Sequence, residues 1–161
     1  MWRQDASVGL RERTLQAPSQ TTVRQAWEAW HAGALELLEA PVAIVEQIIE
    51  TLRPGVTFAE AAAVGEEARR KATSNIPARR EGQDKHAYPH FGHTIGLGWE
   101  NIWIYAGEPR PLEAGMHLAV ETSVGRPDIG FAMFEQNLLI TDGGVELTSK
   151  CEPRWWTRST P

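Results

Sequence analysis

The chain has 161 residues, a net charge of −5 and one cysteine, Cys151, so it suits a single domain and has no internal disulfide. Its basic residues over residues 66–81 lie among acidic ones instead of forming a positive stripe, which argues against a nucleic-acid partner. No apolar run approaches the roughly 20 residues of a membrane span and no signal-peptide pattern is visible, so we expect a cytoplasmic protein without a membrane partner.

One long helical pattern follows an irregular beginning. Residues 1–20 keep no sustained period. From Thr22 onward, apolar residues recur every three or four positions, which predicts an amphipathic helix. Pro41 removes a backbone donor inside this pattern, so we expect the helix to kink or restart there before it ends near Arg53-Pro54-Gly55.

A second helix has a clear beginning. Thr57 is followed three residues later by Glu60, the pattern of a capping box in which each side chain binds the other residue's amide. This predicts a helix through Ala61 to about Ala72. Residues 73–89 are rich in proline, glycine and charge and are expected to form a loop.

The second half of the chain predicts strands. Short apolar or alternating segments are separated by glycine- and proline-containing turns. Two helices followed by an antiparallel run indicate an α+β domain. The predicted strands cover residues 95–97, 103–105, 116–124, 131–140 and 145–147.

Three side chains in the strand region suggest a metal site. Glu121 and Glu135 each interrupt an apolar strand, where an uncompensated carboxylate is unfavourable. Fourteen residues separate them, enough for a strand, a turn and a return strand that bring both to one face. A divalent cation would offset their repulsion, and His93 could complete its ligands. Taken singly, each of the three is more often an ordinary solvated residue.

Several segments resemble the pita-bread metallopeptidases, the family of aminopeptidase P, prolidase (Xaa-Pro dipeptidase), methionine aminopeptidase and creatinase. Gly92–Leu97 resembles the family's GHGIGL segment and Leu112–Glu121 its LxPGMxxxxE. The segment Phe134–Thr148 resembles RIEDxxxVTxxGxExLT, and Leu52–Thr57 matches RPGVT. The resemblance covers residues 32–149 and implies a pita-bread fold with helices on a curved antiparallel sheet.

The resemblance also implies an activity. His93, Glu121 and Glu135 correspond to metal ligands, so the expected reaction is hydrolysis of a short peptide by a metal-bound water, and the expected peptide has proline at the second position. Glu100 and His90 are the candidates for proton transfer or substrate contact. The expected cofactor is a divalent ion, Mn, Co or Zn, and a single ion rather than two. A homodimer is an expected assembly.

The chain departs from the family pattern at its N-terminal side. Metal-dependent members carry two aspartates eleven residues apart before the first helix, but Asp5 is the only aspartate before Gly82. Glu100 stands where the family has a second histidine, and Thr122 replaces the usual proline. We therefore expect an incomplete pita-bread domain over residues 21–150, between an irregular segment 1–20 and a tail 151–161.

Three alternatives to the hydrolase remain. A catalytically inactive module would bind peptide or protein partners through the same cleft, and the missing aspartates favour this reading. A fragment would obtain its missing strands from a partner or a second copy, because unpaired sheet edges invite pairing. A metal-free amidinohydrolase similar to creatinase is disfavoured by the missing second histidine.

Overall fold

The computed structural model describes residues 20–75, 89–97, 99–126, 129–150 and 152, and the predicted segment 1–20 and most of the predicted loop lie outside them. Two helices are followed by five strands joined in one antiparallel sheet of order β2-β1-β3-β4-β5. This confirms the α+β prediction. The elements are α1 (Gln20–Thr51), α2 (Phe58–Ala72), β1 (Gly92–Ile95), β2 (Trp99–Trp103), β3 (His117–Arg126), β4 (Gly130–Thr141) and β5 (Gly144–Leu147).

The first helix continues through its proline. α1 is a single helix of 32 residues with Pro41 inside it, so of the two predicted outcomes at Pro41, a kink or a restart, the restart is excluded. Pro41 is fully buried, as are Ile44 and Ile48 one and two turns later. Burial of this face against the rest of the molecule therefore outweighs the loss of one hydrogen bond, a loss of roughly 3 kcal/mol in an isolated helix.

The predicted capping box begins α2. The Thr57 amide donates to Glu60 Oε2 at 2.8 Å, and the Glu60 amide donates to Thr57 Oγ1 at 3.1 Å. The loop before β3 also holds this end of the helix, because Phe58 and Ala59 donate their amides to the carbonyls of Arg110 and Glu108.

The first two strands begin earlier than predicted. β1 covers Gly92–Ile95 instead of 95–97, and Leu97 is fully exposed. β2 covers Trp99–Trp103 instead of 103–105. The bounds of β1 follow from its pairing with β3, and those of β2 from its pairing with β1. A Cβ on Gly92 would lie 2.0 Å from the Ala119 carbonyl oxygen, so the backbones of β1 and β3 approach where glycine permits it. The apolar pattern of the sequence around Gly92 does not indicate such a contact.

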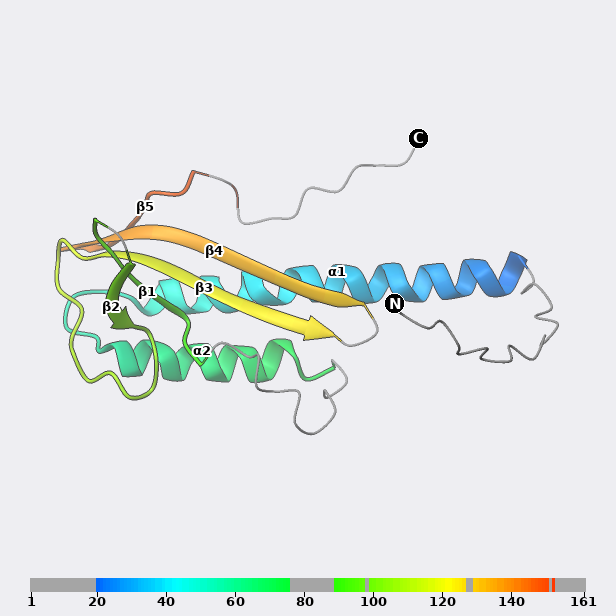
Figure 1. Ribbon diagram of the computed structural model, residues 1–161, viewed down its shortest axis with the longest axis horizontal. Coiled ribbons are helices and arrows are strands. Elements are labelled where there is room, and N and C mark those ends of the chain that lie inside the picture. The colour runs from blue at the N-terminus through cyan, green and yellow to red at the C-terminus, as the bar shows by residue number, and fades with distance from the viewer. Residues whose placement is uncertain (1–19, 76–88, 98, 127–128, 151, 153–161) are drawn as a thin grey trace, which may run out of the picture.

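The helices cover one face of the sheet. α1 runs alongside β3 and β4, and α2 lies beside α1 (Figure 1). The even-numbered residues Leu118, Val120 and Leu138 of β3 and β4 are fully buried in one core with Ile44 and Phe58 of the helices. Because strand side chains alternate, the odd-numbered residues face the other side.

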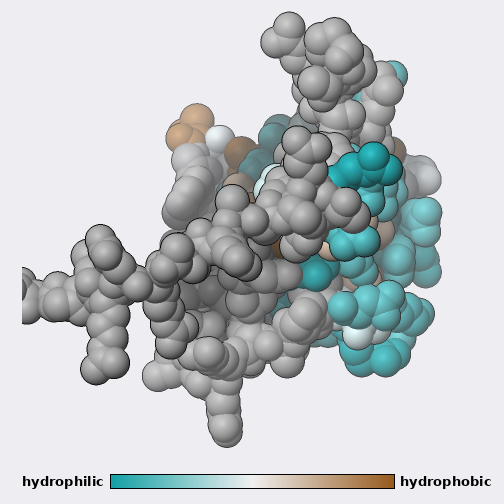
Figure 2. All heavy atoms as spheres, turned by 90° about the vertical axis from the view of Figure 1, so that its right-hand side faces the viewer, coloured by the Kyte–Doolittle hydropathy of each residue, from teal (hydrophilic) through white to brown (hydrophobic). Residues whose placement is uncertain are grey.

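The N-terminal part of α1 extends beyond the sheet (Figure 1). Viewed from that end, most of the surface coloured in Figure 2 is hydrophilic. Among the described residues, no helix is both long enough and apolar enough to cross a membrane.

Candidate metal and substrate site

The two predicted carboxylates lie directly opposite each other. In the β3–β4 ladder, Glu121 pairs with Glu135. Side chains of such a cross-strand pair share one face, with Cβ atoms roughly 4.5–5.5 Å apart. The fourteen-residue spacing thus places both glutamates on the face opposite the helices. Glu121 is partly buried, whereas Glu135 is exposed.

His93 lies on the same face, one strand away. It pairs with Ala119 of β3, two residues before Glu121, and only 8% of its surface is exposed. Its Nδ1 lies 3.0 Å from the Thr94 carbonyl oxygen. Since a carbonyl only accepts, Nδ1 carries the proton in this contact and Nε2 carries the lone pair of the neutral ring. A backbone acceptor on one nitrogen is the usual arrangement of a histidine that binds metal through the other.

These residues line one open pocket of about 430 Å³. His90, the predicted substrate contact, is also at its wall. Five further residues complete the lining, four of them apolar. The full lining is His90, His93, Ile95, Trp103, Ala119, Glu121, Met133, Glu135 and Asn137.

The pocket disfavours negative charge on both glutamates at once. Burial raises the pKa of the Glu121 carboxyl, the nearby Glu135 raises it further, and His93 acts in the opposite direction. Burial also lowers the pKa of His90, with smaller contributions from His93 and Arg69. His90 is therefore held as the neutral imidazole at neutral pH, and the pair of glutamates favours a cation or a shared proton.

Donor chemistry, pocket face and histidine tautomer fit a divalent metal ion. The side chains as they stand do not form a finished metal shell: within the described part of the chain, no three His, Cys, Asp or Glu side chains lie close enough to share an ion. Metal binding would require these side chains to move closer together. The ligand roles of His93, Glu121 and Glu135 remain predictions.

Glu100, the other predicted proton-transfer residue, lies in β2. Its side chain is outside the described atoms, so its role also remains a prediction. Five pocket residues were not predicted from the sequence: Ile95, Trp103, Ala119, Met133 and Asn137. Among them, Trp103 offers an aromatic face and Asn137 a polar side chain, and no local feature of the sequence marks either one. Only the strand register assigns both to the pocket face.

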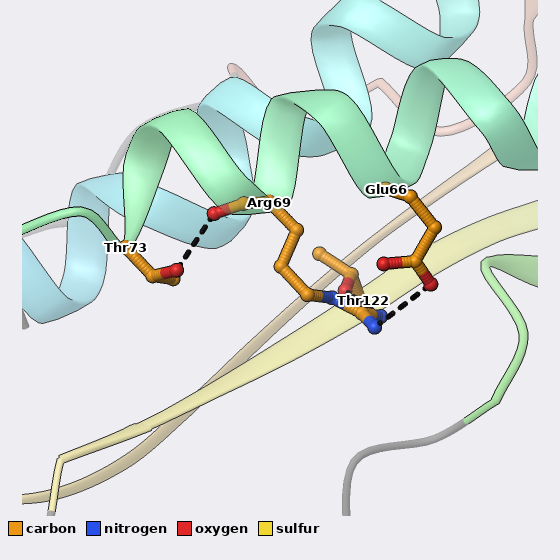
Figure 3. Close-up of polar contacts among 4 residues, drawn as sticks. All are labelled: Glu66, Arg69, Thr73 and Thr122. Carbon is orange, nitrogen blue, oxygen red and sulfur yellow. Dashed lines mark hydrogen bonds and ion pairs between the residues drawn. The ribbon is translucent and has the colours of Figure 1, made fainter. Parts of the chain in front are cut away.

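Arg69 supports the sheet from the helix side. It reaches from α2 to β3, where its Nη2 donates to Thr122 Oγ1 at 3.3 Å (Figure 3). Its guanidinium also lies 4.2 Å from the centre of the Phe91 ring and 3.3 Å from a Glu66 oxygen. Thr122 follows Glu121 directly, so this contact ties α2 to the strand position beside the candidate ligand.

Comparisons with known proteins identify the family and the fold. The model of metallopeptidase family M24 matches residues 17–142. No curated protein sequence matches the chain. Dipeptidase PepE from Mycobacterium ulcerans is 25% identical, with a TM-score of 0.60 over 74% of this chain and 30% of that one.

Two further solved structures share the fold. Prolidase from Pyrococcus furiosus is 24% identical, with a TM-score of 0.58 over 73% of this chain and 32% of that one. The N-terminal domain of FACT complex subunit SPT16 from chickpea, Cicer arietinum, is 14% identical, with a TM-score of 0.61 over 74% of this chain and 29% of that one. The chain thus spans about 30% of the length of the dipeptidase it matches, and the sheet with its two helices is part of a pita-bread fold.

Proposed function

This chain belongs to metallopeptidase family M24, and we propose that its pocket takes part in metal-dependent hydrolysis of a short peptide. The observation that carries the proposal is the direct pairing of Glu121 with Glu135 in a pocket that also contains His93. Two opposed carboxylates and an imidazole with its lone pair on Nε2 are donors suited to a divalent ion.

Each residue would have a distinct part in the reaction. Glu121 and Glu135 would hold the ion from neighbouring strands and His93 from the third, with the Thr94 carbonyl fixing the ring of His93. The ion would supply Lewis acidity to the scissile carbonyl and would lower the pKa of water. His90, kept neutral by its lowered pKa, can accept a proton or a hydrogen bond from the substrate at the pocket wall.

Metal binding provides the first test. Wild-type protein cleared of metal by a chelator is titrated with Mn²⁺ in a calorimeter, beside Glu121→Gln and the control Glu146→Gln. Glu146 is an exposed glutamate of β5 that does not line the pocket. We expect saturable binding by wild type and the control, and at least about tenfold weaker binding by Glu121→Gln, since a lost charged ligand is worth 1.4 kcal/mol or more.

Hydrolysis of the dipeptide Ala-Pro, measured through the release of proline, provides the second test. Wild type with bound Mn²⁺ should release proline, and Glu121→Gln should not. Absence of saturable Mn²⁺ uptake by wild type, or equal uptake by Glu121→Gln, would overturn the metal site.

The substrate residue, the metal ion, the assembly and the location are further proposals. We propose an Xaa-Pro peptide substrate because prolidase from Pyrococcus furiosus is among the structural neighbours. A single Mn, Co or Zn ion is proposed because the chain offers three candidate ligands. We propose a cytoplasmic location from the composition of the chain. We propose homodimerisation because β2 and β5 are the edge strands of the described sheet, and strand edges invite pairing.

A catalytically inactive peptide-binding module is the second candidate. It is favoured by the placement of the described side chains, among which no three His, Cys, Asp or Glu lie close enough to share an ion. This candidate predicts that Ala-Pro peptides bind with the same affinity in the presence and absence of Mn²⁺, without release of proline.

A further inference from the structure

Four residues form a straight row across the pocket face. Trp103 of β2 pairs with His93 of β1, His93 pairs with Ala119 of β3, and Ala119 pairs with Asn137 of β4. All four line the pocket. Neighbouring strands lie about 4.8 Å apart, so this row spans roughly 14 Å from Trp103 to Asn137, the length of a short peptide.

The row has a short side chain in its middle and a large side chain at one end. Ala119 contributes a single methyl group between His93 and Asn137, and it is almost fully buried. Trp103 stands beside both histidines, with its ring centre 4.2 Å from that of His90 and 5.2 Å from that of His93. Contact with two rings restricts the indole, so Trp103 forms a fixed apolar wall beside an open floor.

The other end of the row offers a hydrogen-bond acceptor. The main chain of Asn137 is anchored, because its amide donates to Ser149 Oγ at 3.0 Å and its carbonyl accepts from the Thr148 amide at 2.8 Å. Its side-chain Oδ1 is buried and has no hydrogen-bond partner among the described residues. Such an acceptor is unfavourable until a donor reaches it.

We propose that this row recognises the substrate, and that Asn137, Ala119 and Trp103 determine specificity in the hydrolysis proposed above. Asn137 Oδ1 accepts a hydrogen bond from a backbone amide N–H of the peptide. The methyl floor at Ala119 leaves room for a compact apolar residue, which packs against the indole of Trp103. The preferred ligand is therefore a tripeptide such as Ala-Pro-Ala, in which a small apolar residue precedes an N–H-bearing peptide bond; the dipeptide Ala-Pro would make the apolar contact without this hydrogen bond.

Two probes isolate the hydrogen bond. The tripeptide Ala-Pro-Ala has one backbone N–H, that of its third residue, because the bond before proline has none. Its analogue with lactate as the third residue replaces that N–H by an ester oxygen. Dissociation constants are measured by calorimetry on full-length protein kept free of metal by a chelator, so that hydrolysis does not interfere.

Asn137→Ala should weaken binding of the tripeptide about fivefold, which corresponds to one neutral hydrogen bond of about 1 kcal/mol, and should leave binding of the ester analogue unchanged. An equal effect on both probes, or no effect on either, would overturn the assignment of Asn137.

A matched pair of variants tests the floor. Ala119→Leu places a large side chain in the pocket, whereas Ser123→Leu places the same side chain four residues along the same face of β3, outside the pocket lining. Ala119→Leu should weaken tripeptide binding at least about tenfold and Ser123→Leu should have no more than a twofold effect. Urea unfolding confirms that each variant is folded.

Equal effects of these two variants, or no binding of the tripeptide by wild type, would overturn the recognition row. These results are independent of the proposed hydrolysis. Tripeptide binding without Mn²⁺ uptake and without proline release would overturn the hydrolase while leaving the row intact.

Discussion

Gly92 lies where β1 crosses closest to β3. Its φ is +136°, a backbone conformation that residues with a side chain rarely adopt. The Ala119 carbonyl also occupies the space that a Cβ would need. Gly92 directly precedes His93, so the same close approach sets the position of the candidate histidine ligand.

Gly92→Ala should therefore destabilise the protein strongly. The dihedral alone contributes about 1–3 kcal/mol, and the contact with Ala119 adds to it. We expect the urea midpoint to fall by at least about 1 M. Gly143→Ala is the matched control, because Gly143 has no positive φ and nothing within 4 Å of its added Cβ. Similar midpoints for the two variants would contradict this account of Gly92.

At the scale of elements, the start of α2 shows how local chemistry defines a boundary. The Glu60 carboxylate accepts from both the amide and the hydroxyl of Thr57, at 2.8 and 2.9 Å. These two contacts, the amide first, lower the pKa of Glu60 below its ordinary value. The whole device lies within four residues, which is why the sequence alone could predict it.

Thr57→Ala should lower the free energy of unfolding by about 1 kcal/mol, the usual loss when a threonine cap is removed.

Glu60→Gln should also destabilise the protein, to an extent that depends on pH. Because the pKa of Glu60 is lower in the folded state, its contribution is complete above the unfolded value of 4.5 and is lost as the pH falls through the folded value. Urea titrations of wild type and Glu60→Gln at several pH values should converge in acid; a constant difference would contradict the assignment.

The strands show what the sequence could and could not predict. The facing pair Glu121 and Glu135 followed from their spacing and from strand alternation, and β3 and β4 were placed within about two residues at each end. The bounds of β1 were displaced because they depend on pairing with β3, more than twenty residues away, and those of β2 because they depend on pairing with β1. Trp103 and Asn137 were missed for the same reason, since their shared row exists only once four strands are in register.

At the scale of the whole molecule, packing is unevenly distributed along α1. From Gly33 onward α1 contributes buried residues to the core, including Leu37, Ile44 and Ile48. Before Gly33, every side chain of α1 that the structure describes is exposed, and this part extends past the sheet (Figure 1). Helices without packing are marginal in water, so the two parts of α1 should differ in stability.

Hydrogen exchange measures this difference. Amides of α1 before Gly33 should exchange at least about a hundredfold faster than those of residues 42–50, because local opening of the exposed part does not disturb the core. Exchange at the same rate along the whole helix would contradict this, and would mean that an additional contact covers its N-terminal part.

Because Glu121 pairs with Glu135, the number of residues between them determines whether both carboxylates reach the pocket. A deletion of one residue between these positions would shift β4 by one place and send every side chain after it to the opposite face. Leu138 and Ile140 would then be solvated, and Glu135 would enter the apolar layer beneath the sheet. Natural variants of this protein should therefore tolerate substitutions in the turn but conserve the number of residues that it contains.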